Sequence, residues 1–387
     1  MRSPSPSPGD ALGLTTALVR IDSRNPGLVP GAPGEAACAR LLAGVLREWG
    51  FSVDVTEAAP GRPNVVARIG TAGGRSLLFN GHLDVVGTEG MTHAPFDADV
   101  RDGALYGRGS ADMKAGIAAM CAAAVRARDA GALRGEVIVA AVADEEFQSL
   151  GTRALLASGV RADGAIVTEP TRLRVMPAHR GFAWCTVTVH GRAAHGSRYD
   201  IGVDAIRHAG LLLAELDAFD AVELPGRTPH ALLGRASLHA SLIEGGTGLT
   251  TYPDRCVLRL ERRTIPGERP GAALDEVEAA CARVRAARPS FRAEVSLDFE
   301  QPPSDVAGDA PLVRALLEAA SAAGEAPTPL EGMSAWTDAA LLNEAGIPAI
   351  CFGPGDIGLA HSATEFVPVD EIERATSVLA TLIAQWE

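Results

Sequence analysis

Four apolar runs in this sequence each end at or near side chains that can bind a metal ion. The runs are SLLFNG, VIVAAVA, AIVT and PAICFG, and the polar residues that follow them are, in order, His82 and Asp84, then Asp144, Glu145 and Glu146, then Glu169, then His361. Short, continuously apolar runs are typical of strands buried on both faces of a sheet. Ligands bind such a sheet in the crevice beyond the carboxyl ends of its strands, so we expect these side chains to converge.

Helical segments separate the apolar runs. The segment SADMKAGIAAMCAAAVRARDAG is alanine-rich and predicts a helix over residues 110–131, with Ser110 as a candidate N-cap. Strands that alternate with helices predict an α/β fold in which helices cover a mostly parallel or mixed sheet.

The texture of the chain changes between about residues 180 and 296. Segments such as FAWCTVTVHG and DRCVLRLERRTI alternate as half-exposed strands do, and helical segments lie between them. A chain of 387 residues is long enough for two domains. We therefore predict a discontinuous metal-binding catalytic domain over 1–179 and 297–387, interrupted by a smaller α+β domain over 180–296.

Composition excludes several classes of partner. The formal net charge of -13 disfavours binding to nucleic acid or to an anionic membrane. No apolar stretch is long enough to span a bilayer. The six cysteines are scattered without a CxxC pair, which is typical of reduced thiols, and we expect a cytoplasmic protein.

Each candidate ligand is weak evidence when taken alone. A single HxD can be an ordinary turn histidine, and DEE is often a solvated helix start. Asp112 lies in GRGSADMKAG, between glycine-rich turns and a helix start, where it could face a cation or simply cap the helix. Lys114 is the only lysine of the chain, which indicates either a site that requires a compact ammonium or chance.

Taken in order, the motifs resemble those of the M20 family of metallopeptidases and deacylases. They are GHLDVV, GRGSADMKAG, ADEE, TEP and AHSATEFV, and the insertion adds GRAAHGSRYDIGVDAI and LRLERRTIPGE. The resemblance covers essentially the full chain. The loop GPGDIGLAHS is most similar to the acetylornithine deacetylase branch, which favours a small N-acyl amino acid.

The resemblance implies a cage for two divalent metal ions. One ion would be held by His82, Asp112 and Glu169, and the other by Asp112, Glu146 and His361, with Asp112 as the bridge and a cis peptide bond after it. Imidazole and carboxylate ligands without thiolate suit Zn²⁺ and also accept Co²⁺ or Mn²⁺.

Two further carboxylates have catalytic roles in this interpretation. Glu145 resembles the family's general base, which takes a proton from the attacking water and passes it to the leaving amine. Asp84 lies two residues beyond His82 and could accept the other ring N–H of that ligand, which would fix its tautomer.

The inserted domain resembles the family's lid and dimerisation domain. His195 resembles a histidine that reaches the substrate carbonyl in the partner subunit of family dimers, although it could be an ordinary loop residue. Arg263 matches the arginine that binds the substrate carboxylate, a task suited to a bidentate guanidinium. Its neighbour Arg262 has no match and is expected to face solvent. A homodimer through this domain is the predicted assembly.

The function predicted first is hydrolysis of a small N-acyl amino acid. The alternatives are a dipeptidase or carboxypeptidase that uses the same metals, with a dipeptide or related small molecule as substrate, and a metal-binding protein without catalysis. The presence of Glu145 argues against the last alternative.

Overall fold

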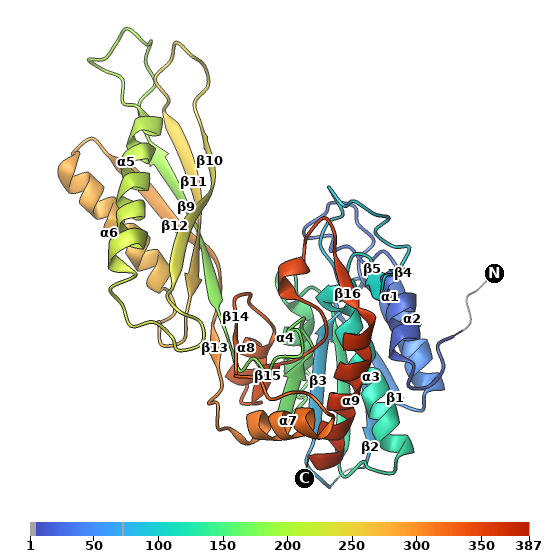
Figure 1. The fold of residues 1–387 in the computed structure, drawn as a ribbon. Helices are drawn as coiled ribbons and strands as arrows, with labels where there is room; N and C mark the ends of the chain where they lie inside the picture. The colour runs from blue at the N-terminus through green and yellow to red at the C-terminus, as the bar shows by residue number, and fades with distance from the viewer. Residues whose placement is uncertain (1–4, 72, 387) are drawn as a thin grey trace. The chain divides into compact units, whose positions relative to one another are not determined.

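The computed structural model describes residues 5–71 and 73–386 and divides them into two compact units (Figure 1). The first unit comprises the described residues up to Ala178, together with Val306–Met333 and the residues from Thr337 onward. The second unit comprises His179–Asp305 and Ser334–Trp336. Residues 1–4, 72 and 387, which belong to the predicted catalytic segments 1–179 and 297–387, lie outside the described residues.

A six-stranded mixed sheet forms the centre of the first unit. In spatial order its strands are β1 (Ser52–Ala59), β2 (Arg62–Gly70), β6 (Glu136–Val142), β3 (Leu77–His82), β7 (Gly164–Val167) and β15 (Ala349–Cys351). The pairs β6–β3, β3–β7 and β7–β15 are parallel, whereas β1–β2 and β2–β6 are antiparallel. The carboxyl ends of the four parallel strands therefore share one edge of the sheet.

Helices cover both faces of this sheet, because its central strands carry apolar side chains on both faces. Phe79 of β3 belongs to the large core beneath the first set of helices, while the next residue, Asn80, donates a hydrogen bond of 3.0 Å to Thr152 on the other face. The first set consists of α1 (Ala11–Val19), α2 (Ala36–Glu48), α3 (Ala115–Asp129), α7 (Pro311–Ala322) and α9 (Val369–Gln385). The second set consists of α4 (Leu150–Ala157) and α8 (Ala339–Glu344). The predicted helix-covered mixed sheet is confirmed.

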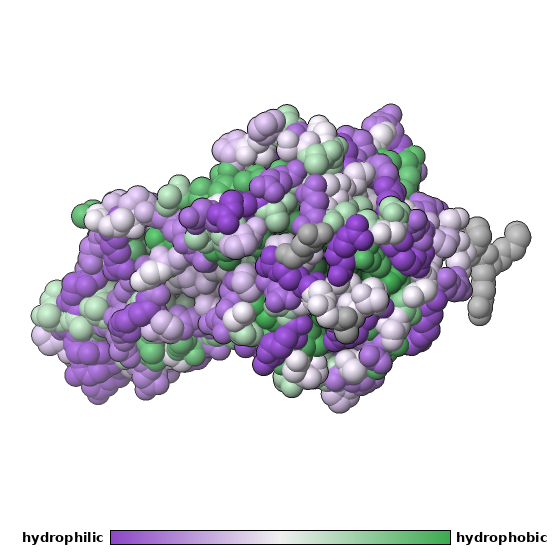
Figure 2. Space-filling model, turned by 90° about the horizontal axis from the view of Figure 1, so that it is seen from below, coloured by the Kyte–Doolittle hydropathy of each residue, from purple (hydrophilic) through white to green (hydrophobic). Residues whose placement is uncertain are grey.

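Short elements complete the first unit. A small antiparallel sheet joins β16 (Phe366–Pro368), β5 (Ala104–Tyr106) and β4 (Asp99–Arg101), and the remaining elements are η1 (Ser110–Lys114), β14 (Gly332–Met333) and η3 (Ile357–Leu359). Among the described residues, every helix is too short or too polar to traverse a bilayer. Hydrophilic residues make up much of the face seen in Figure 2, and hydrophobic residues are scattered among them.

The second unit is an antiparallel sheet with two helices on one face (Figure 1). Its strand order is β10 (Ser237–Gly245), β11 (Arg255–Thr264), β9 (Gly181–His190) and β12 (Arg292–Gln301). The helices are α5 (Ala205–Ala218) and α6 (Ala272–Ala287), and the short elements are η2 (Phe219–Glu223), β8 (Ala178–His179), which begins on the last residue of the first unit, and β13 (Ser304–Asp305). Alternate residues of β9, such as Cys185 and Val187, form the core with these helices.

The structure corrects the sequence-based prediction for Arg262. Its side chain is only 1% exposed and pairs with Glu276 at 2.9 Å and Glu268 at 2.5 Å, so it does not face solvent. Side chains alternate between the two faces of a strand, and the parity of β11 places Arg262 toward α6 while Arg263 lies on the open face.

The helix predicted over residues 110–131 begins later than expected, at Ala115. Residues Ser110–Lys114 form the tight turn η1, because Asp112 and Met113 have non-helical dihedral angles and the peptide bond between them is cis. The expected cis bond is thus confirmed. Ser110 is the buried first residue of this turn and does not cap α3.

Close packing of α3 against the end of β7 yields a test of the fold. A Cβ added at Gly116 would lie 1.9 Å from the carbonyl oxygen of Thr168, whereas one added at Gly44 of α2 would have no heavy atom within 4 Å. We expect Gly116→Ala to lower the free energy of unfolding by about 1–3 kcal/mol through overpacking. Gly44→Ala, the matched control, should raise it by up to about 1 kcal/mol. Urea unfolding of both variants measures the difference, and equal shifts would contradict this packing.

Candidate metal centre

The parallel strands deliver the predicted ligands to one edge of the sheet. His82 is the last residue of β3 and lies opposite Val142, the last residue of β6, from which Glu145 and Glu146 follow after a short turn. Val167 ends β7 opposite Asn80, and Glu169 comes two residues later. The topology therefore accounts for the meeting of residues that are far apart in the sequence.

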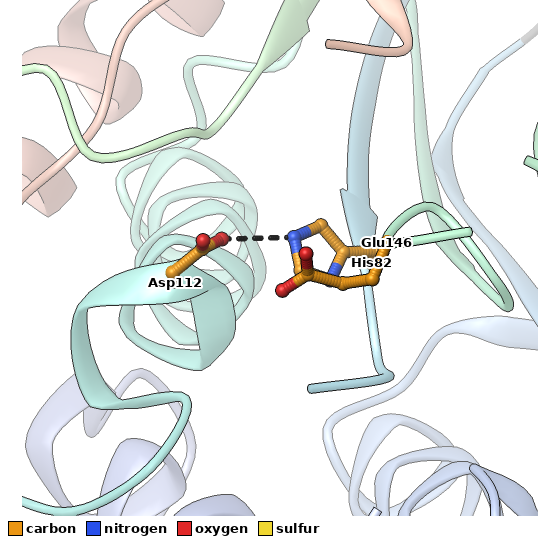
Figure 3. A group of neighbouring side chains, drawn as sticks. All are labelled: His82, Asp112 and Glu146. Atoms are coloured by element: carbon orange, nitrogen blue, oxygen red, sulfur yellow. Dashed lines mark hydrogen bonds and ion pairs between the residues drawn. The ribbon is translucent and has the colours of Figure 1, made fainter. Parts of the chain in front are cut away.

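Asp112 approaches this edge from the turn that precedes α3 (Figure 3). One of its carboxylate oxygens lies 2.9 Å from Nε2 of His82, and the other lies 3.5 Å from Nε2 of His361. Asp112 thus contacts both imidazoles, as the residue predicted to bridge two ions would.

His361 reaches the same place from the loop after β15. Its Nε2 lies 3.0 Å from one carboxylate oxygen of Glu146 and 3.2 Å from the other. Its side chain is 53% exposed, whereas His82 is buried. The cluster therefore has a closed side at His82 and an open side at His361.

Glu145 and Glu169 complete the cluster on the closed side. Their nearest carboxylate oxygens lie 4.0 Å and 3.9 Å from Nε2 of His82. The potential ligand atoms form two sets, and within each set all of them lie within 4.8 Å of one another. One set is His82 with Asp112 and Glu146, and the other is His82 with Glu145 and Glu169. These sets group the residues differently from the division that the family resemblance implies, although all five predicted ligands and Glu145 are together.

The charge of the cluster fits a pair of divalent cations. Four carboxylates, those of Asp112, Glu145, Glu146 and Glu169, lie within 4.0 Å of the two imidazoles. Even two doubly protonated imidazoles would leave two negative charges uncompensated. Oxygen and imidazole nitrogen donors without thiolate are a set that Zn²⁺, Co²⁺ or Mn²⁺ accepts.

The pKa values reflect this crowding of negative charge. Burial, together with the charges of neighbouring carboxylates, raises the pKa values of Glu145 and Glu169 well above their usual range. Burial alone would lower the pKa of His361, but its bonds to Asp112 and Glu146 raise it to about 11. Each group thus favours the state that reduces the net negative charge of the cluster.

Asp84 supports the ligands in a way that the sequence did not predict. The nearest acceptor to Nδ1 of His82 is the backbone carbonyl of Asp84, at 2.9 Å, while its carboxylate is 3.6 Å away. The carboxylate instead accepts the backbone N–H groups of Glu145 and Glu146 at 3.1 and 3.2 Å. Asp84 therefore orients His82 through its main chain and holds the next two acidic residues through its side chain.

Asn25 is a buried residue that sequence reasoning missed. Its Nδ2 donates to Asp84 at 2.7 Å and to Asp144 at 3.0 Å. Asp144 also accepts a hydrogen bond from Arg62 at 2.9 Å, and Arg62 pairs with Glu35. Burial raises the pKa of Asp84 to about 7, and the Asn25 bond opposes that rise. A lone asparagine in a loop has no spacing that could have marked it.

Arg108 and Glu365 were missed as well, although both lie inside motifs that the sequence displays. Nη1 of Arg108 lies 2.6 Å from Oε2 of Glu365, and Oε1 of Glu365 accepts the N–H groups of Ala111 and Asp112. Their position beside candidate ligands in GRGSADMKAG and AHSATEFV was the available signal.

Lys114 does not supply a ligand-facing ammonium. It is fully buried, and its Nζ donates to the carbonyl oxygen of Ile21 at 2.9 Å. Burial lowers the pKa of its ammonium. This contact links the turn before α3 to the segment after α1, which is a structural role for the single lysine.

The two remaining predicted site residues lie in the second unit. His195 is an exposed loop residue whose Nδ1 lies 2.9 Å from the hydroxyl oxygen of Ser197. Arg263 is 32% exposed on the open face of the sheet, where its Nε donates to Glu261 at 2.6 Å and its guanidinium lies over the ring of Phe182. Their predicted roles toward substrate stay predictions.

The surplus negative charge predicts a large stabilisation by divalent cations. Removal of metal with a chelator should lower the midpoint of thermal unfolding. Zn²⁺ at about 100 times its Kd should raise the free energy of unfolding by about 2.7 kcal/mol. Metal binding displaces protons from the carboxyl groups whose pKa is raised, so the stabilisation by Zn²⁺ should shrink as the pH falls. Thermal melts with and without Zn²⁺ measure this effect. Sodium chloride at matched ionic strength is the control, and an equal gain with that salt would contradict a specific centre.

Comparison with known proteins identifies the family of this chain. The model of peptidase family M20/M25/M40 matches residues 78–385. An acetylornithine deacetylase of Myxococcus xanthus is 32% identical over 380 residues, with 96% of each chain covered. An N-formyl-4-amino-5-aminomethyl-2-methylpyrimidine deformylase of Bacillus subtilis is 29% identical, with 89% of this chain and 88% of that protein covered.

A solved structure has a similar fold. A dinuclear metal-binding peptidase of the M20 family from Bacillus subtilis has a TM-score of 0.73 at 17% identity, with coverage of 97% of this chain and 96% of that chain. The family resemblance of the motifs is confirmed. The chain belongs to peptidase family M20/M25/M40 and is a metal-dependent hydrolase that acts on amide bonds.

Proposed function

We propose that this protein hydrolyses the amide bond of a small N-acyl amino acid, with Glu145 as the general base. The observation that carries the proposal is the place of Glu145 in the ligand cluster. Its carboxylate is 10% exposed and lies 4.0 Å from Nε2 of His82, and its backbone is fixed by Asp84. The curated relatives support a small acyl group, since their names describe a deacetylase and a deformylase.

The ligand assignment follows the family resemblance of the motifs, and the contacts of His82 with Asp112 and Glu169, and of His361 with Asp112 and Glu146, are compatible with it. We assign His82, Asp112 and Glu169 to one ion, and Asp112, Glu146 and His361 to the other. Zn²⁺ is the preferred ion, with Co²⁺ or Mn²⁺ as substitutes. Bound there, the pair of ions would supply Lewis acidity and positive charge opposite the oxygen of the amide carbonyl.

Glu145 moves the proton that the reaction requires. Its carboxylate takes a proton from the attacking water, whose oxygen forms a bond to the acyl carbon. The protonated Glu145 then delivers that proton to the amide nitrogen as the carbon–nitrogen bond breaks. The products are the free amino acid and a small carboxylate, and Glu145 returns to its ionised state.

Residues of the second unit provide the substrate contacts in this proposal. Arg263 binds the α-carboxylate of the substrate. Its guanidinium lies over the ring of Phe182 and is partly exposed, so a ligand can reach it. His195 acts on the substrate carbonyl of a partner subunit in a homodimer formed through the second unit. Its exposure is compatible with reaching another chain.

Substitution of the base tests the proposal most directly. Glu145→Gln keeps the size of the side chain but removes its basicity, so we expect kcat to fall by about 100-fold to 10,000-fold. Metal content measured on the same samples should stay at two ions per chain. Glu318→Gln, an exposed change on α7, is the control. An unchanged kcat for Glu145→Gln would refute the assigned base.

Arg263 should control substrate binding more than chemistry. Arg263→Lys retains the charge but loses the bidentate fork, so we expect KM for an N-acetyl amino acid to rise about tenfold with a smaller change in kcat. Arg259→Lys is the matched control, because Arg259 lies on the same strand, four residues before Arg263. Steady-state kinetics distinguish them, and equal effects would contradict a specific role.

A substrate panel separates the deacylase from the peptidase alternative. N-formyl, N-acetyl and N-succinyl amino acids are compared with dipeptides at equal concentration, each with Zn²⁺, Co²⁺ or Mn²⁺. The proposal requires a higher kcat/KM for at least one N-acyl amino acid than for every dipeptide. Preference for dipeptides would replace it with a dipeptidase.

A further inference from the structure

A buried ion pair contacts the two segments that carry Asp112 and His361. The side chains of Arg108 and Glu365 are 3% and 1% exposed, and Nη1 of Arg108 lies 2.6 Å from Oε2 of Glu365. Neither residue belongs to the predicted cage. A pair so completely removed from water is costly unless the remaining donors and acceptors are also satisfied.

Glu365 uses its second oxygen to hold the turn that carries the bridging ligand. Oε1 accepts the backbone N–H of Ala111 at 3.1 Å and that of Asp112 at 3.2 Å. A carboxylate that accepts two backbone donors fixes the orientation of the peptide groups on both sides of Ala111. The Asp112 side chain begins from this fixed segment.

Arg108 uses its other donors to hold the loop that carries His361. Nη2 donates to the carbonyl oxygen of Ser362 at 3.3 Å, next to His361 in the chain, and Nε donates to that of Gly87 at 2.9 Å. Glu365 lies on the same loop, three residues beyond Ser362. The pair therefore ties the His361 loop to the Asp112 turn at two points.

His361 depends on this support more than His82 does. His82 ends a central strand, but His361 lies in a loop, has a positive φ of 60° and is 53% exposed. The distance of 3.5 Å between its Nε2 and Asp112 is thus set by two segments joined through Arg108 and Glu365. We infer that the Arg108–Glu365 pair is a positioning device that sets the affinity of the second, His361-side metal site. This inference rests on the proposed two-metal centre.

Two substitutions separate the parts of the device. In Glu365→Gln, an amide that turns its oxygen to the N–H groups of Ala111 and Asp112 must turn its NH₂ group toward the Arg108 guanidinium, so one contact is lost. Arg108→Lys keeps a positive charge near Glu365 but cannot also reach Gly87 and Ser362. Glu373→Gln is the control, because Glu373 pairs with Arg126 between α3 and α9 without touching a ligand segment.

The experiment measures the two metal affinities of the full-length protein separately. Metal-free protein is titrated with Zn²⁺ against a competing chelator, and with Co²⁺ while the visible spectrum is recorded. In Glu365→Gln and Arg108→Lys we expect the Kd of the more weakly held of the two metal ions to rise by about 10-fold to 100-fold. The Kd of the other ion should stay within about twofold of its wild-type value. The Co²⁺ spectrum should lose the same component that His361→Ala removes. Glu373→Gln should match wild type.

Each outcome has a distinct meaning. If the wild-type chain binds fewer than two ions, the proposed metal centre itself fails. If the wild type binds two and both variants bind two with wild-type affinities, only the positioning inference is overturned. Equal weakening of both ions, or failure of both variants to fold without metal, assigns the pair a general structural role and also overturns it. If one variant does not fold, the other decides.

Discussion

The structure depends on a concentration of negative charge at the carboxyl edge of its central sheet. Four carboxylates and two imidazoles meet where β3, β6 and β7 end, and most of these groups are removed from water. Charges of one sign at such distances repel strongly in a medium of low dielectric constant. A fold can hold them there only if their backbones are fixed and cations balance their charge.

The fixing is done by two further buried carboxylates that play equivalent parts. Asp84 accepts the N–H groups of Glu145 and Glu146, and Glu365 accepts those of Ala111 and Asp112. Each is in turn neutralised or oriented from behind, by Asn25 for Asp84 and by Arg108 for Glu365. The centre is thus supported from two sides by similar chemistry on unrelated segments.

The sequence predicted the parts of the fold and site that follow from strong local patterns. Continuous apolar runs marked the parallel strands, and the residues just after them include His82, Glu145, Glu146 and Glu169, which do come together. Parallel strands leave little freedom for where such residues can lie. The ordered motifs added Asp112 and His361, whose convergence no periodicity reveals.

What the sequence did not reveal depends on tertiary contact. The helix α3 was predicted to begin at residue 110, because the high helix propensity of an alanine-rich segment does not reveal the tight turn around Asp112. Arg262 was wrongly expected in solvent, because only the position of α6 makes that face of β11 buried. Asn25 acts through Asp84, which lies 59 residues away in the chain, and a single asparagine carries no pattern that announces such a partner.

The burial of Lys114 has a consequence for the chemical reactivity of the whole chain. It is the only lysine among 387 residues, and its ammonium lies in the interior against the carbonyl oxygen of Ile21. In the native fold, therefore, no lysine amine is available to acylating reagents, amine-directed cross-linkers or lysine-modifying enzymes. Among the described residues, arginine alone of the two long basic side chains contributes charge at the surface, and such reagents leave its guanidinium untouched. Labelling of Lys114 would therefore report that the segment around the metal-bridging turn has opened.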